Sequence, residues 1–185
     1  SANSSSLSLE GRTPSQSIPN VDFGNKNIYG IGFEVEYVFP YNNNKWAMYF
    51  EPTYKTKYEA SKTVVVGQSA FAYTQDWFAS YTALDLALGL RHYMYINESS
   101  KLFLNVSYLF NPKLNSKLRN NTKQEELTID SLTSYNLGLG YNYNKKYSFE
   151  FRYAHSIKND NPFNTKFKTI SVVLGYRIFE NNKNK

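Results

Sequence analysis

Ionised residues recur at alternate positions of several segments, with apolar or aromatic residues between them. In 27–40, Glu34 and Glu36 alternate with Phe33, Val35 and Tyr37. Side chains of a β-strand point to opposite faces with a period of two, so one face of this segment carries carboxylates and the other is apolar. The ionised residues predicted on the polar face of all such segments are Glu34, Glu36, Glu51, Lys55, Asp85, Arg91, Glu150, Arg152 and Arg177.

This charged set could do two kinds of chemistry inside a closed barrel. An eight-stranded barrel is just wide enough for side chains to fill, and an unpaired buried charge is costly, so acids and bases should pair there. We therefore predict a structural network of interior ion pairs. A proton or ion path through the same network is the alternative.

The two histidines are the other candidates for chemistry. His92 and His155 lie at the alternate strand positions that otherwise carry apolar residues. A histidine on this face, at the membrane surface, could act as a base on a lipid. Ser156 follows His155, but neighbours on a strand point to opposite faces and cannot form a nucleophile–base pair. We predict no catalytic residue and expect interfacial histidines without a catalytic role.

Metal and cofactor sites have little support in the sequence. The chain has no cysteine, which excludes a disulfide framework and thiolate metal sites. Glu125, Glu126 and Asp160 could bind a divalent cation, but their spacing does not resemble a calcium loop. We predict no metal site and no cofactor.

The elements that must position these residues are strands. Leucines at 84, 86, 88 and 90 alternate strictly, which fits a strand and not a helix. The segment 46–58 is expected to place Trp46 and Tyr58 outward and Lys55 and Lys57 inward. Seven strands are expected at about 27–40, 46–58, 81–96, 102–110, 135–141, 147–153 and 169–178, with a weaker one at about 5–11.

The connections between these strands alternate in length. Residues 39–45, 96–101 and 143–146 are short, Asn-, Ser- and Lys-rich links, whereas 11–26, 60–80, 113–128 and 157–167 are longer. Barrels of the outer membrane have short periplasmic turns and long extracellular loops. Both termini then fall on the periplasmic side, and the strands beside 60–80 are expected to extend beyond the membrane.

Composition agrees with one membrane-spanning β domain. A chain of 185 residues fits a single domain, and it is rich in aromatic residues, with 17 Tyr and 13 Phe. It has no run of about 18 apolar residues that could form a spanning helix, but a spanning strand needs only about 9–11. The net charge of +6 favours anionic surfaces, but the basic residues are scattered, so nucleic acid is not expected as a partner.

The sequence therefore predicts an all-β fold, an eight-stranded antiparallel up-and-down transmembrane β-barrel. Residues 1–26 form a Ser-rich segment with the weak first strand and a loop, 27–179 the other seven strands, and 180–185 a polar tail. Outward aromatic residues are expected at the two membrane interfaces. They include Tyr37, Phe39, Trp46, Tyr54, Tyr141, Tyr147 and Tyr176.

Three segments resemble the outer-membrane β-barrel domain family common in Bacteroidetes. They are 50–54 (FEPTY), 88–96 (LGLRHYMYI) and the closing 173–179 (VLGYRIF). The resemblance runs from about Asn27 to Phe179, and more loosely it extends to small barrels of other Gram-negative bacteria. It implies an outer-membrane location and an up-and-down barrel, without implying one activity.

These observations favour a non-enzymatic outer-membrane barrel with a filled interior, acting as an envelope scaffold or a small accessory subunit of a larger complex. The expected partners are outer-membrane lipids, lipopolysaccharide and other outer-membrane proteins. Two alternatives stay open. A lipid-modifying barrel enzyme would need a Ser–His–acid cluster at one rim, and a soluble lipocalin-like carrier would need an apolar interior.

Overall fold

The computed structural model describes residues 2–11, 21–66, 73–120, 125–127, 132–156 and 163–179. These residues form β-strands and one short 3-10 helix, η1 (Asn42–Asn44). No helix in this part of the chain is long and apolar enough to cross a membrane. The strands are β1 (Ala2–Gly11), β2 (Val21–Gly32), β3 (Val35–Val38), β4 (Trp46–Lys55), β5 (Tyr58–Val66), β6 (Tyr73–Tyr95), β7 (Lys101–Asn111), β8 (Lys113–Asn120), β9 (Glu125–Leu127), β10 (Leu132–Tyr143), β11 (Tyr147–Ser156) and β12 (Phe163–Tyr176).

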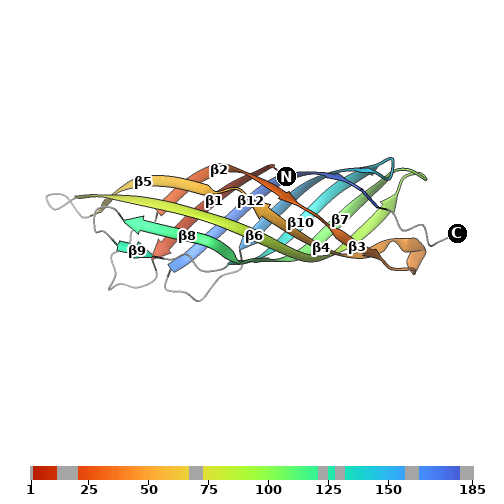
Figure 1. Cartoon of the computed structure of the whole chain (residues 1–185), viewed down its shortest axis with the longest axis horizontal. Coiled ribbons are helices and arrows are strands. Elements are labelled where there is room, and N and C mark those ends of the chain that lie inside the picture. The colour runs from red at the N-terminus through yellow and green to blue at the C-terminus, as the bar shows by residue number, and fades with distance from the viewer. Residues whose placement is uncertain are drawn as a thin grey trace.

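The strands close into a ring in which every pairing is antiparallel (Figure 1). Strand β1 lies between β2 and β12, and β4 pairs with both β2 and β6. From β6 the ring continues through β7, β10 and β11 to β12. Eight strands in up-and-down order make this ring when β2 with β3, β4 with β5, and β7 with β8 are each counted as one. The predicted fold is confirmed.

Two of these subdivided strands are interrupted beside a proline. Strands β2 and β3 keep one register against β4, from Ile31 opposite Tyr54 to Val35 opposite Phe50. Between them the N–H of Phe33 donates to the carbonyl of Pro52 at 3.2 Å. Proline has no N–H to return that bond, so the ladder loses one hydrogen bond without losing its register. Pro112 separates β7 from β8 in the same way.

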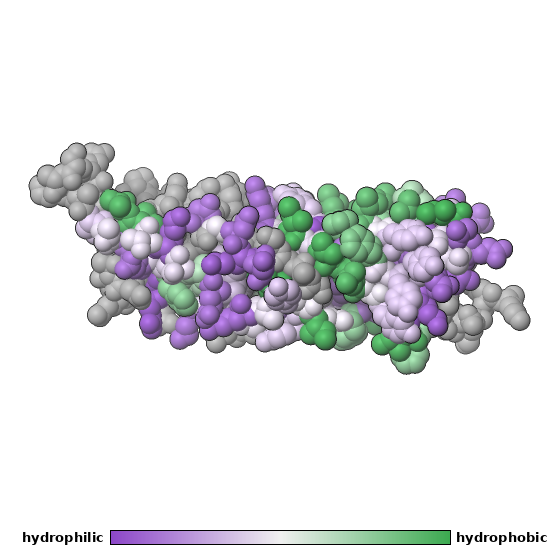
Figure 2. Space-filling view, turned by 90° about the horizontal axis from the view of Figure 1, so that it is seen from above, coloured by the Kyte–Doolittle hydropathy of each residue, from purple (hydrophilic) through white to green (hydrophobic). Residues whose placement is uncertain are grey.

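The wall of the barrel has an apolar outside and a polar inside. Along β6, Leu88 and Leu90 are exposed whereas Asp85 and Arg91 are buried. Strands β7, β10 and β11 alternate in the same sense. Figure 2 shows apolar residues gathered over the half of the barrel that ends in the short turns, with hydrophilic residues beyond them on both sides. A closed wall of this kind satisfies its backbone internally and presents hydrocarbon to lipid, as a transmembrane barrel must.

A β-bulge between β4 and β5 reverses the side-chain parity predicted for 46–58. Tyr54 lies opposite Leu84, but Tyr58 lies opposite Tyr81, so one extra residue is inserted at Thr56–Lys57. Tyr58 therefore points inward and is 1% exposed, while Lys57 is exposed and pairs with Glu59 at 2.5 Å. The expectation that Tyr58 faces out and Lys57 faces in was wrong, because a single inserted residue exchanges the two faces.

The strands also run further than the sequence suggested. Strand β1 begins at Ala2, β2 at Val21, β6 at Tyr73 and β12 at Phe163, so 11–26, 60–80, 113–128 and 157–167 are loops only in part. Outward positions of β6 before Leu84 are Thr74, Asp76, Phe78, Ser80 and Thr82, and all of them except Phe78 are polar. The apolar alternation therefore ends where the strand leaves the membrane, although its hydrogen bonding continues. We call the part made by β5, β8, β9 and Tyr73–Thr82 of β6 the extension.

Candidate functional site

The described interior of the barrel holds the charged side chains in three groups along its length. In the group nearest the short turns, Arg91 reaches from β6 to Glu34 and Glu36. Its guanidinium is 2.7 Å from Glu34 and 2.5 Å from Glu36. Arg177, just past β12, lies 3.8 Å from the other oxygen of Glu36. One arginine thus lies between two carboxylates, and a second arginine shares one of them.

Aromatic rings enclose the Arg91 guanidinium. Its central carbon lies 4.8 Å from the ring centroid of Tyr49 and 4.6 Å from that of Phe103. The hydroxyl of Tyr93 donates to Glu36 at 2.5 Å. Glycine at Gly140 leaves the space for the Phe103 ring, because an added Cβ would overlap it. Arg91 is only 5% exposed, so its charge is balanced by carboxylates and by ring faces instead of water.

The middle group is centred on Arg152 of β11. Its guanidinium lies 2.7 Å from Glu51 of β4 and 2.7 Å from Glu150 of its own strand. Glu51 also accepts a hydrogen bond from the hydroxyl of Thr53 at 3.2 Å. A Cβ added at Gly138 would overlap the Glu150 carboxylate, so this glycine makes room for the ion pair.

Asn105 of β7 links these two groups. Its carbonyl accepts a bond from Arg91 at 2.8 Å, and its amide donates to Glu150 at 2.8 Å. The sequence analysis did not name Asn105 or Tyr93 as members of the network. Both lie on the inward parity of their strands, Tyr93 two residues after Arg91 and Asn105 between the buried Phe103 and Ser107. Alternation alone was therefore a signal that could have found them.

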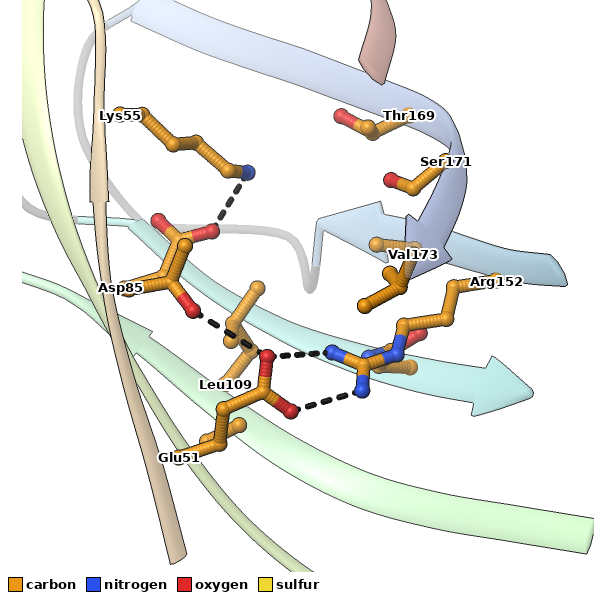
Figure 3. Close-up of a pocket in the computed structure, with 12 residues that line it drawn as sticks. Glu51, Lys55, Asp85, Leu109, Arg152, Thr169, Ser171 and Val173 are labelled. Carbon is orange, nitrogen blue, oxygen red and sulfur yellow. Dashed lines mark hydrogen bonds and ion pairs between the residues drawn. The ribbon is translucent and has the colours of Figure 1, made fainter. Parts of the chain in front are cut away.

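The third group lies towards the extension. Lys55 of β4 forms an ion pair with Asp85 of β6, and Asp85 also accepts a hydrogen bond from Asn111. Figure 3 shows Lys55 and Asp85 on one side of a small cavity with Glu51 and Arg152 on another. The cavity has a volume of about 30 Å³, enough for about two water molecules. Asn136 lines it, and its buried carbonyl oxygen has no hydrogen-bond partner among the described residues.

All nine interior residues named from the sequence therefore lie in ion pairs. Each acid faces at least one base from another strand or, for Glu150, from its own. Opposite charges held this closely satisfy one another in an enclosed, low-dielectric space. The arrangement suits a rigid interior, and its structural role stays a prediction. A lipocalin-like carrier with an apolar interior does not agree with this sidedness.

The histidines lie on the outer wall. His92 packs against Trp46, with ring centroids 4.6 Å apart. His155 packs against Tyr135 at 5.7 Å and Tyr153 at 6.4 Å. Ser156 is buried on the inner side, so His155 and Ser156 point to opposite faces.

The aromatic residues expected at the interfaces face outward. Tyr37, Tyr54, Tyr147 and Tyr176 are exposed, and Phe39, Trp46 and Tyr141 are half-buried between neighbours. Several pack edge-on or tilted, as Tyr37 does on Phe39 at 5.6 Å and Tyr147 on Tyr176 at 5.5 Å. Their anchoring role at the interface stays a prediction.

No candidate metal centre appears in the described ranges. Within them no three His, Cys, Asp or Glu side chains lie together in a group that could hold a metal ion. Asp160 and the side chains of Glu125 and Glu126 fall outside what the structure describes.

The interior of the extension contains a stacked tyrosine pair. Tyr58 and Tyr81 lie opposite each other with ring centroids 4.9 Å apart. Burial raises the pKa of Tyr58 to about 12, and the nearby Asp22 carboxylate raises it in the same sense. Burial also raises the pKa of Tyr81. Both phenols therefore stay neutral through the ordinary pH range.

Comparison with known proteins gives structural neighbours only. No protein-family description matches the chain, and no curated protein does. Among solved structures it is similar to Ail, the attachment invasion locus protein of Yersinia pestis, in complex with the heparin analogue sucrose octasulfate. The identity is 17%, the TM-score 0.42, and the match covers 95% of this chain and 94% of that one. A second Ail structure gives 16% and 0.41, with 95% and 93% covered.

The strand pairing and the sidedness described above establish the fold. The chain is a transmembrane β-barrel.

Proposed function

We propose that this barrel is a non-enzymatic scaffold of the bacterial outer membrane, or a small accessory subunit of a larger complex there. The observation that carries the proposal is its filled interior. Arg91, Arg152 and Lys55 reach across to carboxylates on other strands, leaving a cavity of about 30 Å³ between two of these groups. Such an interior supports the wall and does not conduct.

Contacts with other molecules then fall to the outer wall and to the extension. The apolar band contacts lipid, and the exposed Lys117 and Arg119 of β8 face the level of lipopolysaccharide sugars and phosphates. The likeness of 50–54, 88–96 and 173–179 to the Bacteroidetes barrel family supports a source among those bacteria. The histidines support a non-enzymatic role, since His155 and Ser156 lie on opposite sides of the wall.

A conductance measurement tests the filled interior. The purified barrel inserted in a planar bilayer should give no stable current steps. The variant carrying Glu51→Ala, Glu150→Ala and Arg152→Ala removes the middle group without leaving a lone charge, and it should stay closed too, because the Arg91 and Lys55 groups still fill the barrel on either side. Stable steps from the unaltered protein would contradict the proposal and favour an ion path.

Affinity capture from native outer membranes tests the role itself. The tagged barrel should retain a companion protein in fixed ratio, or be recovered with lipopolysaccharide alone if it is a free scaffold. Incubation with lipopolysaccharide, followed by mass spectrometry of lipid A, should leave the lipid unchanged. A change in its acyl chains or phosphates would establish the enzyme alternative instead.

A further inference from the structure

The middle group of ion pairs has more negative than positive charge. Its single cation, Arg152, lies between the carboxylates of Glu51 and Glu150, at 2.7 Å from each. The third group is neutral, because Lys55 pairs with Asp85. The group nearest the short turns has two arginines for its two carboxylates. One excess negative charge among these residues therefore belongs to the middle group.

This charge is enclosed in the barrel. Glu150 is 3% and Glu51 9% exposed. The other cations that the structure describes on the inward parity lie away from them, since Lys26 is exposed and Lys101 begins β7 beside a short turn. An uncompensated charge is costly in a space that excludes water. The excess charge therefore needs a counter-charge within the middle group itself.

The cavity of about 30 Å³ adjoins this charge and has an unpartnered oxygen in its wall. Glu51 lines it, and so does Asn136, which is 5% exposed and whose Oδ1 has no hydrogen-bond partner among the described residues. Figure 3 shows the hydroxyl groups of Thr169 and Ser171 pointing from β12 into the same space. The lining thus offers carboxylate, amide and hydroxyl oxygens, which are the ligands that hard cations prefer.

The charge and the free oxygen together select the occupant. A water molecule would satisfy the Asn136 oxygen, but it would leave the excess charge in place. An anion would add to that charge. A divalent cation would reverse its sign, and the described residues have no group of three acids or histidines that could hold a metal ion of that kind. A monovalent cation both contacts the free oxygen and neutralises the group.

We propose that the cavity binds one monovalent cation, such as sodium, between the Asn136 amide oxygen and the Glu51 carboxylate. The space holds about two water molecules, so an ion and one water fill it. Membrane proteins bind sodium in a comparable way, through uncharged carbonyl oxygens in an enclosed site. This site adds to the scaffold role and does not depend on it.

The ion is expected to be a part of the folded barrel. Arg91 and its carboxylates close the interior on one side, and the Lys55–Asp85 pair lies on the other. The unfolded chain does not hold these oxygens together, so the ion binds the folded state alone. Binding of this kind stabilises the folded state in proportion to the logarithm of the ion concentration once the site is nearly saturated.

Urea unfolding in zwitterionic phospholipid vesicles tests the proposal. Sodium chloride replaces N-methyl-D-glucamine chloride at constant ionic strength, because this large cation cannot enter the cavity. A tenfold rise in sodium should lower the unfolding equilibrium constant by about three- to tenfold. Asn136→Leu, which removes the free oxygen, and Glu150→Gln, which removes the excess charge, should each abolish this dependence. Asn142→Leu is the matched control on the same strand and the same buried side, and it should retain the dependence.

Two results would overturn the proposal. Equal stability in the two salts, with an infrared band of a protonated carboxyl that Glu150→Gln removes, would mean that a proton neutralises the group and that the cavity holds water. A sodium dependence that persists in both the Asn136→Leu and the Glu150→Gln variants would mean that sodium acts at another place. The second variant keeps the test decisive if the first does not fold.

Discussion

Arg91 shows how single residues fix the interior. It contacts Glu34, Glu36 and Asn105 and lies between the rings of Tyr49 and Phe103. Removing this cation leaves the carboxylates of Glu34 and Glu36, whose side chains are 29% and 12% exposed, without their main partner. That is costlier than removing all three charges together. The stability that this group gives the folded barrel therefore depends on all of its charges being present and not on any one ion pair.

We expect Arg91→Met alone to lower the free energy of unfolding by about 3–5 kcal/mol. The triple variant Arg91→Met, Glu34→Gln, Glu36→Gln should lose clearly less, because no carboxylate is left without its main partner and Arg177, which loses Glu36, is 30% exposed. Urea unfolding in phospholipid vesicles measures both. Lys57→Met serves as the control, since the Lys57–Glu59 pair is solvent-exposed and should change little. Equal losses from the single and triple variants would show that Arg91 is solvated.

Tyr58 gives a pH dependence at the level of one residue. Its folded pKa, about 12, lies above the ordinary value of about 10. Between these values the unfolded chain loses this proton and the folded one keeps it, so the folded state loses stability as pH rises through this window. Titration of [13Cζ]tyrosine by NMR should give the raised value for Tyr58, and Asp22→Asn should bring it closer to the ordinary one. A Tyr58 signal that titrates like free tyrosine would contradict its burial.

At the scale of elements, alternation predicted the strands and the side on which most residues lie. The period of two placed all nine ionised residues in one interior. It could not predict which acid meets which base, because that depends on the offset between strands that are distant in sequence, such as β4 and β11 for Glu51 and Arg152. It also failed at Thr56–Lys57, where an inserted residue changes the parity but has no distinctive residue type.

The lipid-facing side of β6 provides a prediction about an element. Leu86 is on the outward parity in the apolar band, so Leu86→Arg should lower stability by about 2–4 kcal/mol and slow assembly in vesicles. Ser61→Arg, on the exposed outer side of β5, is the matched control and should assemble normally. Heat-modifiable migration on gels measures the folded fraction. Normal folding of the Leu86 variant would mean that this side of β6 is not in lipid.

The whole molecule has two sections with different surroundings. Strand β6 alone is 23 residues long, whereas crossing the hydrocarbon takes about 9–11. The β-bulge at Thr56–Lys57 and the register shift beside Thr82 lie where the apolar band gives way to the extension. The change of surroundings thus coincides with changes in strand register.

The two tryptophans distinguish these sections. Trp46 is on the outer wall beside a short turn, whereas Trp77 is 3% exposed inside the extension and donates to Gln75 at 3.2 Å. Brominated lipids should therefore quench the fluorescence of Trp77→Phe, which retains Trp46, and leave that of Trp46→Phe almost unchanged. Equal quenching would place the extension in the bilayer.

The extension has a practical consequence for protein engineering. Strands β5 and β6 remain paired up to Val66 and Tyr73. A foreign epitope grafted between these two residues would therefore be held away from the lipid by a paired β-hairpin. Binding of antibodies to this epitope on intact cells would show that the extension faces outside. The barrel could therefore serve as a scaffold for displaying peptides at the cell surface.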